Sequence, residues 1–282
     1  MSRRAAYLQI AAIAVGWGTV ALIIRWVSAP NLVAVFYRVL FASAALGAGL
    51  GLSGHAGAWW QVARRPWAIA MGGCLAVHWL CFFGAVRETS IASAVFATTS
   101  TPIFLAVLGP LLLGERLHAT ALFATALGLA GVAVMTGLGD PGEVRPLGVA
   151  LGLTAAVLGA FIPIAGKFLG RTSAPAVIVG VQTAVATGIL LPVALASGIA
   201  VSPSDLALLA VLGVVHTGLA LSLYYRALQR IPVQTAGVLG LLEPVSAAFL
   251  AWLVLGEPAS STTVVGGMLI VLGALLVRPR GG

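Results

Sequence analysis

The sequence predicts an all-α integral membrane protein with ten transmembrane helices, arranged as two inverted five-helix repeats. Three observations lead to this fold class: the composition, the length of the apolar runs and an internal repeat. Of the 282 residues, 60% are apolar and only 8% are charged, and the mean hydropathy is +1.09. Soluble domains carry about 25% charged residues, so this chain could not cover a surface that faces water.

The apolar runs set the number and the kind of membrane segments. They repeatedly reach the roughly 20 residues that a spanning helix requires, and their pattern differs from the alternation of an outer-membrane barrel. Long connections are expected only at residues 53–66 and 139–146. The expected helices lie near residues 6–26, 31–52, 67–86, 91–113, 119–138, 147–167, 175–197, 205–228, 234–255 and 262–277.

The basic residues orient these helices. A formal charge of +8 could indicate a nucleic-acid partner in a soluble protein, but here the basic residues lie in short gaps between apolar runs and act as topology signals. An even number of spans puts both termini on one side, and the positive-inside rule makes that side the cytoplasm. The three outside residues are then Arg25, Arg87 and Arg145, against eleven inside: Arg3, Arg4, Arg64, Arg65, Arg116, Lys167, Arg171, Arg226, Arg230, Arg278 and Arg280.

The second half of the chain repeats the first at an offset of 142 residues. Prolines, Leu-Gly-Glu endings and basic residues all match at this one offset: Pro102 with Pro244, 113–115 with 255–257, and Arg25 with Lys167. We therefore expect a first repeat at 1–138, a linker at 139–146 and a second repeat at 147–282.

Each repeat holds an odd number of helices, so the second copy must insert upside down relative to the first. Inverted repeats are typical of alternating-access transporters, whose substrate site lies near the midplane where the repeats meet. The matching prolines, Pro102 and Pro244, lie half-way along the fourth and ninth helices and are predicted hinges beside that site. Each proline removes a backbone donor and frees the carbonyl four residues earlier, on Thr98 and Gly240. The alternative is a simple kink in a packed helix.

Glu243 lies in the run TAGVLGLLEPVSAAFLAWLVL, which is otherwise uncharged. A carboxylate at that depth costs roughly 3 kcal/mol, so it needs a reason to be there. It directly precedes Pro244, and its counterpart in the first repeat is Thr101. Two interpretations stay open: a chemical group that is protonated or meets a substrate ammonium, and a buried carboxyl that fixes helix packing.

Several other polar and aromatic residues fall near the midplane. Histidines there favour a cavity position over plain packing, and aromatic walls with few polar groups suit an aromatic or amphipathic zwitterion. Phosphorylated substrates are disfavoured because they need several cations, and Arg38 is the one mid-membrane candidate, unless it extends toward the outer surface. The residues predicted to bind substrate are Trp17, Tyr37, Arg38, His78, Trp79, Thr98, Thr99, His216 and Glu243.

The chain resembles the EamA-type members of the drug/metabolite transporter superfamily. The resemblance covers nearly the whole chain and rests on the duplicated five-helix unit, Gly16-Trp17-Gly18, Pro30, Arg38 and the two Leu-Gly-Glu endings. Within that superfamily, His78-Trp79 is similar to the YddG-like aromatic amino-acid exporters. This resemblance implies a secondary transporter that exports aromatic and neutral amino acids across the bacterial inner membrane. The alternatives are a multidrug or cation exporter and a transporter of another small metabolite.

Enzymatic activity is not expected. The sequence Gly51-Leu52-Ser53-Gly54 matches the motif of intramembrane serine proteases, but Ser53 leads into a polar loop, about half a bilayer from His78 and His216. His55 is too close in the chain to build a site. The expected partners are therefore a small-molecule substrate and the lipid bilayer, with no nucleic acid, no cofactor and no metal.

Overall fold

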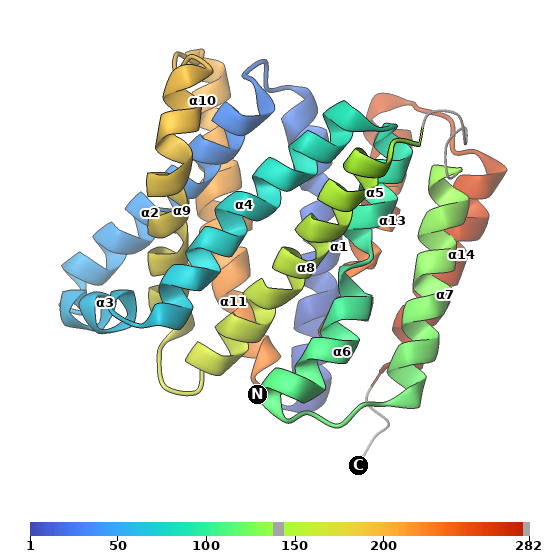
Figure 1. Ribbon diagram of the computed structural model, residues 1–282, viewed down its shortest axis with the longest axis horizontal. Coiled ribbons are helices and arrows are strands. Elements are labelled where there is room, and N and C mark those ends of the chain that lie inside the picture. The colour runs from blue at the N-terminus through green and yellow to red at the C-terminus, as the bar shows by residue number, and fades with distance from the viewer. Residues whose placement is uncertain (138–143, 279–282) are drawn as a thin grey trace.

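The computed structural model describes residues 1–137 and 144–278, and this part of the chain forms a bundle of long helices (Figure 1). The first half contains α1 (Arg3–Arg25), α2 (Asn31–Leu52), α3 (Ala56–Ala63), α4 (Pro66–Glu88), α5 (Ile91–Thr99), α6 (Thr101–Leu113) and α7 (Ala119–Thr136). The second half contains α8 (Pro146–Leu169), α9 (Pro175–Ala196), α10 (Pro203–Val211), the π-helix η2 (Leu212–Leu219), α11 (Ala220–Leu228), α12 (Val233–Gly240), α13 (Leu242–Leu255) and α14 (Ser261–Leu276).

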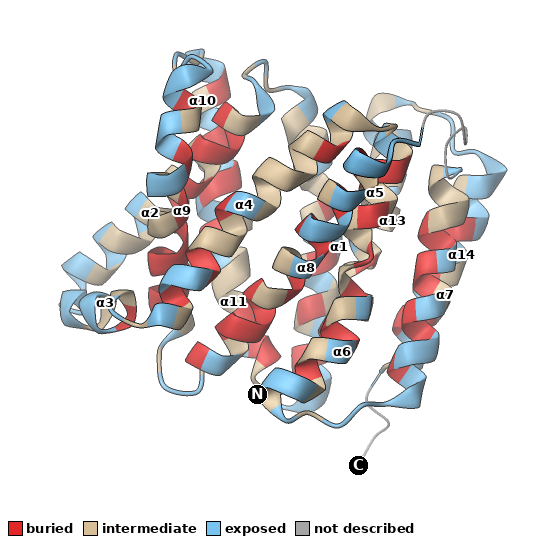
Figure 2. Cartoon of the chain, viewed as in Figure 1, coloured by how far each residue is buried: buried red, intermediate tan, exposed pale blue. Residues whose placement is uncertain are grey.

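Most of these helices are long and apolar enough to cross a membrane. Nine spans in the described residues meet both criteria, with α5–α6, α10–η2–α11 and α12–α13 each acting as one span. The tenth predicted helix, α14, is apolar but has only 16 residues, so the count of ten stays a prediction. Large apolar side chains such as Leu111 and Phe123 are exposed, and exposed residues run along α7 and α14 (Figure 2). Such surfaces fit a lipid environment.

The two prolines break their helices more sharply than the sequence suggested. The fourth span ends at Thr99 and restarts at Thr101, and the ninth is divided at Leu241. Pro102 and Pro244 lie at the start of the second segment in each case, where a missing backbone N–H is tolerated. The two breaks therefore occupy matching places in the two halves.

The eighth span carries an irregularity that its counterpart lacks. Residues Leu212–Leu219 form a π-helix between α10 and α11, whereas α4, the third span, is a continuous α-helix. A π-helix of this kind adds one residue per turn and is frequent at functional sites. The apolar run at 205–228 predicts an uninterrupted helix here, and that prediction is wrong at Leu212–Leu219.

The loops differ from expectation in one respect. Residues 53–66 were expected to be irregular, but Ala56–Ala63 forms the short helix α3, whose Trp59 packs against the apolar core. The predicted linker at 139–146 lies mostly outside the described residues, which resume at Val144. The predicted end of the fifth helix at residue 138 and the basic residue Arg280 also lie outside them.

The two halves pack mainly against each other. The helix α4 runs along α8, α2 along α9, α1 along α13 and α14 along α7. Close approach depends on small residues: a Cβ on Gly18 would lie 2.7 Å from the backbone nitrogen of Ala247. Beside this contact, Ser246 donates a hydrogen bond of 2.6 Å to the carbonyl of Val15. Helices of both halves therefore surround the interior of the bundle.

Candidate functional site

A cavity of about 120 Å³ lies between helices of both halves. The helices α1, α2 and α4 contribute from the first half, and α8, α9, η2 and α11 from the second. Its lining combines three aromatic rings, one guanidinium and two neutral polar groups with aliphatic side chains: Trp17, Arg38, Val39, Leu75, Trp79, Ile162, Gln182, His216, Thr217 and Leu221.

Arg38 is the cation of this cavity. Its Nε donates a hydrogen bond of 2.7 Å to Thr217 Oγ1, and its Cζ lies 5.7 Å from the centroid of the Trp79 ring. A guanidinium over an indole face is attracted by the ring quadrupole. Thr217 and Trp79 thus hold the side chain inside the bundle, rather than directed at the outer surface.

The π-helix positions two further groups of the cavity lining, His216 and Thr217. Thr217 lies on η2, and its hydroxyl donates to the carbonyl of Leu212 at 3.0 Å while accepting from Arg38. The carbonyl of His216 accepts a 3.0 Å hydrogen bond from Trp17 Nε1, and the His216 ring lies 2.7 Å from Thr19 Oγ1. The π-helix therefore offers α1 two hydrogen-bonding groups of His216, its backbone carbonyl and its imidazole ring.

Gln182, like Thr217, is a polar residue of the lining that the sequence did not predict. Its side chain is fully buried on α9, and its Oε1 accepts a 2.8 Å hydrogen bond from Tyr225. Gln182 belongs to the lining of the cavity, and its Nε2 is buried with no hydrogen-bond partner among the described residues. A buried amide donor without a partner costs free energy, so it is an unusual feature that needs an explanation. A glutamine in the middle of an apolar helix was the available signal.

Several other predicted site residues do not line this cavity. The His78 ring bonds the carbonyl of Ala155 on α8 at 2.7 Å, and Tyr37 donates to the carbonyl of Ile199 at 2.9 Å. Thr98, whose buried hydroxyl has no partner in the described part of the chain, and Thr99 lie at the break between α5 and α6. Trp17, Arg38, Trp79 and His216 thus line the cavity together, whereas His78, Tyr37, Thr98 and Thr99 are not part of its lining. The His78 ring packs against Trp79, with 5.3 Å between the ring centroids.

Glu243 occupies a distinct position. Its side chain is exposed at the start of α13 and makes no hydrogen bond or ion pair among the described residues. It attracts Arg38 electrostatically, although the two do not form an ion pair. The carboxylate is therefore accessible and is not bonded within a packed helix interface.

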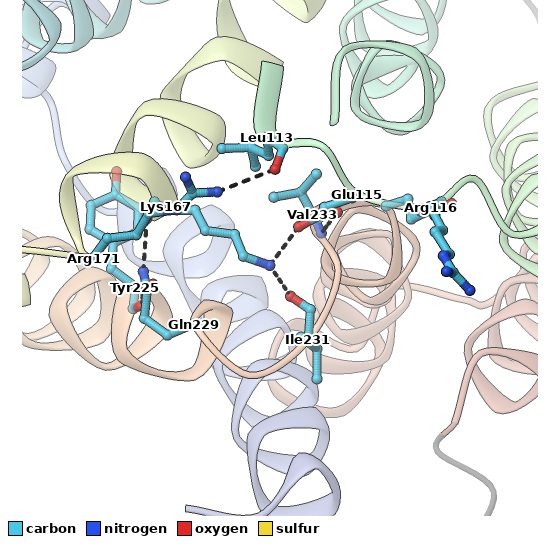
Figure 3. Close-up of polar contacts among 10 residues, drawn as sticks. Leu113, Glu115, Arg116, Lys167, Arg171, Tyr225, Gln229, Ile231 and Val233 are labelled. Atoms are coloured by element: carbon cyan, nitrogen blue, oxygen red, sulfur yellow. Dashed lines mark hydrogen bonds and ion pairs between the residues drawn. The ribbon is translucent and has the colours of Figure 1, made fainter. Parts of the chain in front are cut away.

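A second polar cluster lies at one end of the bundle (Figure 3). Lys167 Nζ, at the end of α8, forms an ion pair of 2.5 Å with Glu115 after α6, and donates to the carbonyl of Ile231 at 2.6 Å. The other carboxylate oxygen of Glu115 accepts from the backbone N–H of Val233 at 2.9 Å. Both charged side chains are largely buried. These contacts tie the ends of three spans together.

A related ion pair lies after α1 and α13. Arg25 and Glu257 are 2.6 Å apart, and both side chains are substantially exposed. The sequence analysis placed Glu257 and Glu115 at matching positions, and likewise Arg25 and Lys167.

Comparison with known proteins decides the family. The EamA-like transporter family matches residues 4–137 and again residues 146–278. This chain belongs to the EamA-like transporter family. The duplicated match accounts for the two halves and for the resemblance to the drug/metabolite transporter superfamily.

Relatives of this EamA-like chain are named as transporters. It is 28% identical to an uncharacterized transporter of Archaeoglobus fulgidus over 69% of this chain and 70% of that one. It is also 28% identical to the uncharacterized transporter YwfM of Bacillus subtilis, over 72% and 70% of the two chains. The uncharacterized transporter YxxF of the same organism is 23% identical over 94% and 86%.

A solved crystal structure shares the same fold. It covers 98% of this chain and 96% of its own, with a TM-score of 0.82 and 24% identity. At this identity the likeness concerns the architecture alone. It supports the helical fold of this EamA-like protein and carries no information on the substrate.

The protease-like motif has no protease geometry. Ser53 Oγ donates to the carbonyl of Gly49 at 2.8 Å, within its own helix end. The His55 ring is 3.2 Å from that hydroxyl, but both residues are exposed at the surface. A nucleophilic serine needs a sheltered site with a third group that orients the base. Family membership points instead to transport across a membrane.

Proposed function

We propose that this protein is a secondary transporter that exports amino acids, preferring aromatic and neutral ones, across the bacterial inner membrane by alternating access. Both termini would lie in the cytoplasm, as the distribution of basic residues indicates. The observation that carries the proposal is the cavity between the two halves, in which one guanidinium lies among indole rings.

The lining of the cavity fits the two parts of such a substrate. Trp17, Trp79 and Leu221 offer an apolar wall for a side chain, and Arg38 offers a charge for a carboxylate. Sites for small molecules are commonly about 300 Å³ or larger, so a cavity of about 120 Å³ holds the polar head of an amino acid. The remainder of a bulky side chain requires the halves to separate, as alternating access provides.

A flux assay in proteoliposomes tests the proposal. Purified protein is reconstituted, and counterflow of tryptophan, alanine and a quaternary ammonium drug is measured with and without a pH gradient. We expect tryptophan and alanine to exchange, with tryptophan faster. Flux of the drug, with no exchange of either amino acid, would overturn the proposal.

That second outcome would support the alternative of a multidrug or cation exporter. The observation that favours it is Glu243, an exposed carboxylate without a hydrogen bond in the described residues. An unpaired carboxylate attracts organic cations. Orientation is tested separately with single cysteines at Arg64 and Arg145, which an impermeant reagent should label from opposite sides.

A further inference from the structure

We propose that Gln182 and Arg38 together bind the carboxylate of the substrate and so determine its class. This inference rests on the proposed function and adds a specificity-determining residue to it. Gln182 is fully buried and belongs to the lining of the cavity that also contains Arg38. Its Nε2 has no hydrogen-bond partner among the described residues.

The polar lining carries more donors than acceptors. In the described residues, Arg38 uses Nε alone in a hydrogen bond, so its two terminal amino groups keep their donor capacity. The acceptor capacity of Gln182 Oε1 is engaged by Tyr225, which leaves the amide N–H₂ group as a donor. No aspartate or glutamate contributes to the lining.

An excess of buried donors around one cation selects an anion. A planar carboxylate accepts two parallel bonds from a guanidinium and further bonds from an amide. The Tyr225 hydroxyl fixes the orientation of the Gln182 amide before a ligand arrives. An ammonium in the same position would leave the Gln182 donor unsatisfied and would face Arg38, so cations are rejected at this wall.

Binding of indole compounds to the purified wild-type protein is the first test. Thermal stabilisation is measured with indole-3-propionate, which has a carboxylate and no ammonium, and with tryptamine, which has an ammonium and no carboxylate. We expect the carboxylate to stabilise the protein and tryptamine to have no effect at equal concentration. Stabilisation by tryptamine alone would overturn the inference.

Variants of Gln182 provide the second test. Gln182→Met keeps the length and removes the donor, and the KM for tryptophan should rise about tenfold, as expected for a lost bond to a charged group. Gln182→Glu should raise it further through repulsion. The control is Gln9→Met, whose amide bonds the carbonyl of Leu223 outside the cavity and whose loss should leave the KM unchanged.

The two proposals can fail separately. Absence of amino-acid flux together with selective binding of indole-3-propionate would refute amino-acid export but retain the carboxylate site. Amino-acid flux with an unchanged KM in Gln182→Met would refute the role of Gln182. If Gln182→Met does not fold, binding by the wild-type protein still decides between carboxylate and ammonium.

A separate observation supports a second proposal: the two ion pairs are equivalent latches at opposite ends of the transport path. The Lys167 latch (Lys167–Glu115) and the Arg25 latch (Arg25–Glu257) each join one residue of the first half to one of the second. The 142-residue offset that relates the halves converts one pair into the other. The spans that carry them end at opposite ends of the bundle (Figure 1).

The latches are unequal in strength. The Lys167 latch is largely buried and is reinforced by main-chain bonds to Ile231 and Val233, whereas the Arg25 latch is exposed. Exposed ion pairs contribute little because water screens them. We infer that the Arg25 latch opens first, so that the end holding Lys167 stays closed in the resting protein.

Distances between pairs of spin labels, placed at each end of the bundle, test the second proposal. Arg25→Met should broaden the distance distribution at its own end only, and Lys167→Met should open the other end. If Lys167→Met does not fold, Glu115→Gln removes the charge while its amide oxygen can still accept from Val233. Variants in which neither end opens, or in which both open the same end, would contradict the latches.

Exchange of charges sharpens the distinction between the two latches. The double variant Arg25→Glu with Glu257→Arg should restore the wild-type distances fully. Exchange of Lys167 and Glu115 should restore them only in part, because a glutamate at position 167 cannot donate to Ile231 and a lysine at 115 cannot accept from Val233. If the exchange of Lys167 and Glu115 restored the wild-type distances completely, the main-chain bonds to Ile231 and Val233 would not be part of the latch.

Discussion

The two helix breaks occupy matching places in the two halves, but their polar groups have opposite surroundings. At the first break, the Thr101 hydroxyl donates to the carbonyl of Thr98 at 2.9 Å and lies 3.3 Å from the carbonyl of Ala156 on α8. At the second, the aligned residue is Glu243, which is exposed and has no hydrogen bond in the described residues. One break is bonded to its neighbours, and the other presents an accessible ionisable group.

The third and eighth spans show the same difference. His78 lies on the regular helix α4 and bonds the carbonyl of Ala155, which fixes α4 against α8. His216 lies in the π-helix, contacts the Thr19 side chain on α1 and lines the cavity. In the first half these midplane groups reinforce packing, whereas in the second half they stay accessible. Two related backbones can thus carry structural contacts in one half and accessible polar groups in the other.

The largest effect is expected from Glu243→Gln, which tests whether the carboxylate at the second break takes part in transport. The substitution removes a charge at constant volume and breaks no hydrogen bond of the described structure. We expect transport to fall by about tenfold or more, in line with ionisable residues in membranes being functional by default, while the melting temperature stays near that of the wild type. Loss of folded protein would instead assign Glu243 to packing and remove the contrast between the breaks.

An intermediate effect is expected from a matched pair of histidine variants. His216→Ala should raise the KM several-fold with little loss of stability, because its ring lies at the cavity and is only partly buried. His78→Ala should lower the free energy of unfolding by about 1 kcal/mol through loss of its bond to Ala155, with the KM unchanged. Both KM and melting temperature are measured for each variant. A raised KM for His78→Ala would support the sequence-based prediction that His78 binds substrate. It would contradict the assignment of His78 to helix packing alone.

The helical membrane fold was predictable because the bilayer imposes strong rules on sequence. Composition and run length identify apolar spans, and nine of them are present in the described residues. The internal repeat rested on matched residues such as Pro102 and Pro244, and the duplicated EamA-like match confirms it. The helix α3 was not predicted because its 8 residues are too few to stand out as a membrane span within the connection at 53–66.

The π-helix was not predictable from local sequence. Its segment, LGVVHTGL, has the apolar composition of an ordinary membrane helix, and the extra residue is stabilised by contacts from α1 and α2 that only the fold supplies. The bond from Trp17 to the carbonyl of His216 and the bond from Arg38 to Thr217 are such contacts.

Four residues of the cavity lining were predictable from the sequence. Charged and aromatic residues stand out in an apolar chain, and Trp17, Arg38, Trp79 and His216 do line the cavity. Gln182 and Thr217 were overlooked because neutral polar groups barely disturb hydropathy. Depth along a helix also does not reveal which face a residue occupies, so His78 could not be distinguished from His216.

The smallest effect is expected from Thr101→Val, which tests whether the hydroxyl at the first break has a structural role. Valine matches the shape of threonine and lacks the hydroxyl that reaches Thr98 and Ala156, so the free energy of unfolding should fall by about 1 kcal/mol. The control is Thr154→Val, an exposed residue whose hydroxyl bonds Ala150 within its own helix, where a smaller change in melting temperature is expected. Transport by Thr101→Val should keep the wild-type KM, since the hydroxyl is committed to the scaffold. If this variant lost transport at an unchanged melting temperature, the break between α5 and α6 would also take part in transport. Both halves would then contribute functional groups, and not the second half alone.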